Sequence, residues 1–164
     1  MNTRYDIFLE MMDEMDKAYD LMEEYDSMPH IYGQETLYQA ESHIIEMIGK
    51  NNRITVTEIA KRMKKTKSAC SQMIRKLRNK GWVNQTRNSQ NNREYNLSLS
   101  EDGWNIFKAH EEIDKVCFNR GLDNLNKYTD QELQLYLKIQ QEINKSFKED
   151  VEVSKKDFVD ITKK

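Results

Sequence analysis

The sequence predicts a mainly α-helical protein with one small β-hairpin. Glycine and proline are scarce, with five Gly and one Pro among 164 residues, and apolar residues recur at helical spacing over most of the chain. One short stretch instead alternates polar and apolar residues, as strands do, and its apolar members are Tyr95, Leu97 and Leu99. This length suits one domain with its own core.

Residues 1–34 are predicted to form a long amphipathic helix and a loop. Apolar residues repeat every three or four positions among acidic ones, and these are Tyr5, Phe8, Leu9, Met12, Met15, Tyr19 and Met22. Pro29 and Gly33 mark the loop. A second helix is expected over residues 35–50, and its inward stripe comprises Leu37, Ala40, Ile44, Ile45, Met47 and Ile48.

Two short helical patterns joined by a turn follow in residues 54–81. Thr55 and Glu58 have capping-box spacing, in which the hydroxyl and the carboxylate each satisfy a free backbone N–H. Thr66 is the expected N-cap of the second pattern, and Gly81 is its stop signal. The apolar face of this second helix consists of Cys70, Met73, Ile74 and Leu77.

The opposite face of this second helix is polar and basic. It carries Lys67, Ser68, Ser71, Gln72 and Arg75. Such side chains on exposed N-terminal turns suit contact with base edges in a DNA major groove. Strand patterns at 82–87 and 93–99 then flank a polar loop. Helix, turn, helix and hairpin in this order predict a winged helix-turn-helix, which we assign to residues 35–99.

Charge is segregated along the chain. Residues 53–93 hold twelve Lys or Arg and one acidic residue, Glu58, although the whole chain has 26 basic and 28 acidic residues. Neutralisation of nucleic-acid phosphates is the usual reason for a basic segment in an acidic protein.

Residues 100–150 are predicted to form two further helices. Ser100 can cap the first, which extends to near Gly121, and Thr129 and Glu132 form a second capping box. Together they expose more apolar surface than one winged helix can cover, which predicts a partner chain. We therefore expect dimerisation helices at both ends of the chain. The charged tail, residues 151–164, is expected to be frayed or only partly helical.

Several classes of protein are disfavoured by the sequence. It has no apolar stretch of about 18 residues and no signal-peptide pattern, so we expect a cytoplasmic protein without a membrane partner. Cys70 and Cys117 are too few for a disulfide framework. Neither a P-loop nor a Ser/His/Asp order is present, so we expect no enzyme activity.

The motif segment resembles the MarR (multiple antibiotic resistance regulator) family of winged-helix transcription factors. EIAKRM is similar to its first motif helix, SACSQMIRKLRNKGWV to its recognition helix and turn, and NNREYNLSLSEDG to its wing and next helix. The resemblance extends over residues 37–147 and is most specific over 55–103. At the wing tip the family usually has Asp-x-Arg, and this chain has Asn91 and Arg93 at those positions.

This resemblance implies a homodimer that binds a pseudo-palindromic operator, typically as a repressor. Base reading is expected from Ser68, Ser71, Gln72 and Arg75, minor-groove contact from Arg93, and phosphate contact from Lys64, Lys65 and Lys67. Arg87 is also expected to bind DNA. The alternative is a non-specific DNA-binding or protein-interaction module without a ligand signal.

The effector stays open at this point. His110 and Asp114 are four residues apart on one helical face, and both are residue types that bind Zn²⁺. His43, His110 and Asp114, with Glu24, look like the ligand positions of zinc-responsive members of the family. Fatty-acid-synthesis repressors of the family have similar histidines without a zinc role. Zinc, a small organic or acyl effector, and purely structural histidines are the three alternatives.

Overall fold

The computed structural model describes residues 3–51, 53–89, 91 and 94–161, with side chains described up to residue 156. It divides into two compact units, Met1–Lys115 and Val116–Lys164. The helices are α1 (Arg4–Ser27), α2 (Gln39–Lys50), α3 (Val56–Met63), α4 (Lys67–Asn79), α5 (Glu101–Asn124) and α6 (Asp130–Ile161). The strands are β1 (Pro29–Tyr32), β2 (Glu35–Tyr38), β3 (Val83–Arg87) and β4 (Tyr95–Leu99).

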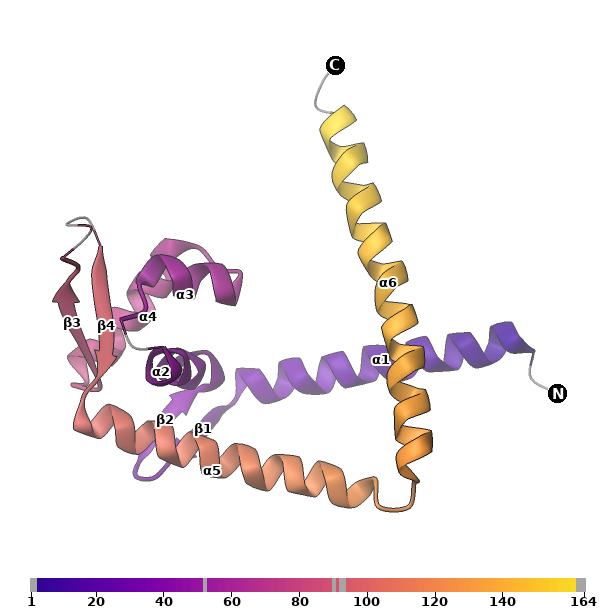
Figure 1. The fold of residues 1–164 in the computed structure, drawn as a ribbon, viewed down its shortest axis with the longest axis horizontal. Coiled ribbons are helices and arrows are strands. Elements are labelled where there is room, and N and C mark those ends of the chain that lie inside the picture. The colour runs from indigo at the N-terminus through magenta and orange to yellow at the C-terminus, as the bar shows by residue number, and fades with distance from the viewer. Residues whose placement is uncertain (1–2, 52, 90, 92–93, 162–164) are drawn as a thin grey trace. The chain divides into compact units, whose positions relative to one another are not determined.

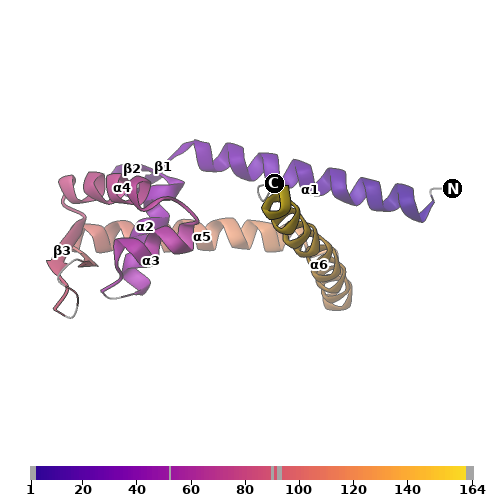
Figure 2. The same cartoon turned by 90° about the horizontal axis from the view of Figure 1, so that it is seen from above.

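The first unit contains a winged helix, as the sequence predicts. Helix α2 runs through the middle of the lobe beside α3, α4 and the first turns of α5, and α1 extends away from the lobe (Figures 1 and 2). Strands β3 and β4 pair antiparallel, with Val83 opposite Leu99. The core combines residues of all these lobe elements, among them Ile44, Ile45, Ile48, Ile59, Ile74, Leu77, Leu97 and Ile106.

Local capping signals define the helix starts. The Thr55 hydroxyl accepts from the Glu58 N–H at 3.3 Å, and the Glu58 carboxylate accepts from the Thr55 N–H at 2.7 Å. The predicted capping box is therefore confirmed. After α4, Gly81 adopts a φ of 79°, the left-handed conformation that glycine accepts most readily.

The prediction for residues 29–38 was wrong. Instead of a loop and the first turn of α2, these residues form the antiparallel hairpin β1–β2, with Gly33 in its turn at a φ of 67°. Two residues of this hairpin, Tyr32 and Leu37, are buried. The Tyr32 hydroxyl donates to Ser42 of α2 at 3.1 Å, so a tertiary contact favours the strand conformation.

The second unit contains the end of α5 and the long helix α6. Thr129 and Glu132 form the predicted capping box, with the Thr129 N–H donating to Glu132 at 2.8 Å. Helix α5 continues through Gly121, where an end or interruption was predicted, and α6 continues to Ile161, into the tail expected to fray. Charged residues such as Lys155 and Glu152, paired at 3.0 Å, are compatible with a helix. Among the described residues, no helix combines the length and apolar character that crossing a membrane requires.

Candidate functional site

Helix α4 presents its predicted polar face to solvent. The Thr66 hydroxyl caps the helix by accepting from the Ala69 N–H at 3.2 Å. Cys70, Ile74 and Leu77 are buried, which turns the opposite side outward. Lys67, Ser68, Gln72 and Arg75 are exposed there, and Ser71 is half-buried. The structure therefore brings together the five α4 residues proposed to face DNA.

The hydroxyl of Ser71 already has a partner within the helix. Its Oγ donates to the Lys67 carbonyl at 2.7 Å. Because a hydroxyl has one proton, the lone pairs of Ser71 remain for a second contact. In this rotamer Ser71 can accept a hydrogen bond from a ligand but cannot donate one.

The basic residues around α4 lie on exposed positions. Lys64, in the turn between α3 and α4, adopts a left-handed φ of 53°, and Lys65 follows it. Arg87 is exposed at the end of β3. Arg93, for which a minor-groove contact was predicted, lies outside the described residues.

The wing is attached to the start of α3 by a contact that sequence reasoning missed. The Thr57 hydroxyl donates to the Glu94 carboxylate at 3.1 Å. Leu97 also donates its backbone N–H to the Ile54 carbonyl at 2.9 Å. The hairpin root is therefore joined to the helix-turn-helix by side-chain and main-chain bonds.

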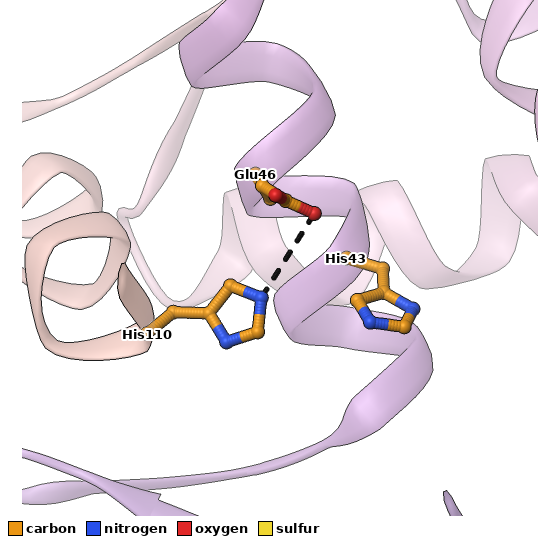
Figure 3. A group of neighbouring side chains, drawn as sticks. All are labelled: His43, Glu46 and His110. Atoms are coloured by element: carbon orange, nitrogen blue, oxygen red, sulfur yellow. Dashed lines mark ion pairs between the residues drawn. The ribbon is translucent and has the colours of Figure 1, made fainter. Parts of the chain in front are cut away.

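A cluster of His43, Glu46 and His110 forms a second candidate site. Figure 3 shows His43 and Glu46 on α2 and His110 reaching toward them from α5. One ligand atom from each residue lies within 4.8 Å of those from the other two. Nε2 of His110 is 3.9 Å from Glu46 Oε2 and 3.6 Å from Asp114 Oδ2. Of the predicted residues, His43 and His110 therefore lie together, and Asp114 lies beside His110 outside the group of three.

His110 is the most unusual member of this cluster. It is 1% exposed, and neither ring nitrogen has a hydrogen-bond partner among the described residues. Burial lowers the pKa of His110, although the Asp114 and Glu46 carboxylates oppose this shift. The imidazole is therefore held neutral, the form in which histidine binds a metal ion.

Glu46 joins the cluster, whereas the predicted Glu24 is not part of the cluster that the described residues form. Burial disfavours the charged form of Glu46, yet the hydrogen bond from Lys50 and its charge hold the pKa of Glu46 below normal. Glu46 is thus a carboxylate. It lies three residues after His43, so helical spacing could have identified it.

A cavity of about 630 Å³ adjoins this cluster. Its wall includes both His43 and Glu46, acidic residues from the end of α1, and Arg62 and Lys65 from the motif segment. The size is within the range of small-molecule sites.

Residues 37–95 match the model of the MarR family. The match covers the winged-helix segment and not the helices at the two ends of the chain. A curated relative, the uncharacterized HTH-type transcriptional regulator YhjH of Bacillus subtilis (strain 168), is 30% identical over 97 residues. The match covers 59% of this chain and 55% of YhjH, so the chain spans about half the length of that relative. The family is one of transcriptional regulators rather than enzymes.

Solved structures share the fold. FabT of Streptococcus pneumoniae, in complex with DNA, matches with a TM-score of 0.65 and 19% identity over 88% of this chain and 98% of FabT. The zinc-responsive MarR family member ZitR of Lactococcus lactis matches with a TM-score of 0.72 and 16% identity, covering 86% of this chain and 99% of ZitR. At these identities the similarity establishes the fold.

Proposed function

We propose that this chain is a homodimeric, sequence-specific DNA-binding transcriptional regulator that acts as a repressor. The placement of α4 carries the proposal. Its apolar face is buried in the lobe, and its polar face is exposed next to exposed Lys and Arg side chains. Ser68, Ser71 and Gln72 suit base edges, and Arg75 suits guanine. Lys64, Lys65, Lys67 and Arg87 suit phosphates.

A second copy of the chain is the proposed cover for the exposed apolar residues of the terminal helices. None of the described α1 side chains is buried, and Tyr5, Phe8 and Leu9 are exposed. In the second unit, the α6 residues Leu135, Tyr136 and Leu137 are also exposed. Apolar surface of this extent is typical of an interface. A two-fold axis would place two recognition helices about 34 Å apart, in successive major grooves.

The test of DNA recognition is selection of binding sites from a random duplex library with the purified protein. The proposal predicts enrichment of an inverted repeat whose half-site centres lie about 10 base pairs apart. Recovery of unrelated sequences would refute sequence-specific recognition and favour a non-specific DNA-binding or protein-interaction module.

For the effector we propose a divalent metal ion of the zinc type at the histidine cluster. His43, Glu46, His110 and Asp114 supply two imidazoles and two carboxylates, a set that suits Zn²⁺. The ring nitrogens of buried His110, which have no hydrogen-bond partner in the described part of the chain, support this fit. Gln39 Nε2 lies 3.0 Å from His43 Nε2 and can orient that ring. A bound ion would supply charge that draws the α2 and α5 residues together.

The alternative effector is an organic or acyl molecule in the 630 Å³ cavity. Calorimetric titration of zinc into chelator-treated protein separates the two. The metal proposal predicts saturable binding that His110→Gln abolishes and Glu24→Gln leaves unchanged. Absence of zinc binding in the folded wild type would refute the metal and leave an organic effector or purely structural histidines as the alternatives.

A further inference from the structure

The recognition helix is joined to α2 by an ion pair. Lys76 Nζ, on α4, lies 2.6 Å from Glu41 Oε1, in the first turn of α2. Glu41 Oε2 accepts the backbone N–H of Tyr38 at 3.1 Å. Lys76 Nζ also lies 5.8 Å from the centroid of the Tyr38 ring. One ammonium group therefore contacts both the strand end and the helix start that precede the histidine cluster.

Burial of its carboxylate makes this pair different from an ion pair between two surface side chains. The Glu41 side chain is 7% exposed, whereas the Lys76 side chain is 53% exposed. A buried carboxylate is tolerated when both oxygens have partners, and here one oxygen has Lys76 and the other has Tyr38. Removal of Lys76 would leave one of these oxygens without its cation. Because the carboxylate is buried, the pair constrains α4 more strongly than a pair between two exposed side chains would.

The place of Lys76 on α4 supports a role other than DNA contact. It lies between Arg75, on the exposed polar face, and Leu77, which is buried. Its side chain reaches toward α2 rather than along the polar face, because it ends at Glu41. Sequence alone does not distinguish Lys76 from the other Lys and Arg residues of 53–93.

We propose that Lys76 is a positioning residue, which through its ion pair with Glu41 sets the recognition helix against α2 and makes no phosphate contact. This inference rests on the proposed DNA-binding function. Lys76 thereby contributes to the preference for one DNA sequence, because base reading requires a fixed helix orientation. It contributes little to general attraction for DNA.

The experiment compares Lys76→Met, Glu41→Gln and the double variant by fluorescence anisotropy on the selected operator and a scrambled duplex, over a series of salt concentrations. Glu41→Gln is decisive because a buried residue cannot touch phosphate, and Gln retains an acceptor for the Tyr38 N–H. Lys76→Arg keeps the pair. The matched control is Arg78→Met, because Arg78 is an exposed basic residue on the same helix.

The inference predicts that Lys76→Met and Glu41→Gln each reduce the operator preference by about tenfold, equivalent to about 1.4 kcal/mol. The double variant should be no worse than Lys76→Met. Scrambled-duplex affinity and the salt dependence should stay as in wild type, and Lys76→Arg should retain the preference. Thermal unfolding of every variant identifies any that fails to fold.

A phosphate contact gives the opposite pattern. Lys76→Met would then weaken binding to both duplexes and reduce the slope of log K against log salt by about 0.9, while Glu41→Gln would behave as wild type. That result overturns the inference, as does an unchanged operator preference in both single variants. If the wild type itself shows no preference, the proposed function fails first and the inference falls with it.

Discussion

Gly103→Ala should destabilise the protein at the junction between the wing and α5. A Cβ at Gly103 would overlap the carbonyl oxygen of Trp82 and stand 3.3 Å from Leu99 Cβ. A backbone carbonyl cannot rotate away, so α5 must shift. This shift strains the 3.0 Å bond from the Ser100 N–H to the same oxygen. At Gly121, in the same helix, a Cβ would meet no atom of the described residues within 4 Å.

Overpacking costs about 1–3 kcal/mol and a weakened hydrogen bond about 1 kcal/mol. The higher helix propensity of Ala than of Gly offsets at most about 1 kcal/mol of this loss of stability. We expect Gly103→Ala to lose about 2 kcal/mol in urea unfolding followed by circular dichroism. Gly121→Ala should gain about 0.5–1 kcal/mol. Equal stability of Gly103→Ala and wild type would refute this description of the junction.

Three further predictions concern single side chains. Thr66→Ala should cost about 1 kcal/mol in the same urea assay, because the α4 N-cap is lost, while Thr66→Ser should be close to wild type. With chelator present, stability should fall as the pH drops below 6.5, the ordinary value for His110, by at most about 1.4 kcal/mol per pH unit. The sign follows because burial lowers the pKa of folded His110, so the unfolded chain binds more protons there; a profile unchanged in His110→Gln would contradict this. Cys70, which is buried with a raised pKa, should resist a thiol reagent until the protein unfolds; rapid labelling at Cys70 in native buffer would count against its placement in the core.

Signals confined to a few neighbouring residues were predictable from the sequence. The capping boxes at Thr55 and Thr129 and the N-cap at Thr66 depend on groups within three positions, and the structure contains all of them. The polar face of α4 follows from helical periodicity in the same way. The order of helices and strands in the winged helix could therefore be predicted without knowledge of any tertiary contact.

Features that depend on distant partners were missed. In the strand at residues 35–38, the apolar residue Leu37 has a spacing that also suits a helix. Pairing with β1 favours the strand over the helix. Glu46 joins the histidine cluster because α5 brings His110 to α2. The pairs Thr57–Glu94 and Glu41–Lys76 likewise connect elements whose contact no local pattern reveals.

The most direct test of the DNA-binding function is the ratio of dissociation constants for a scrambled duplex and the selected operator, measured by anisotropy at one fixed salt concentration. The proposed function predicts a ratio of roughly a thousand or more for the wild type. Arg75→Ala should reduce this ratio at least about tenfold, because a base contact is lost. Equal dissociation constants for the two duplexes, unchanged by Arg75→Ala, would contradict the assignment of α4 as a sequence-reading helix.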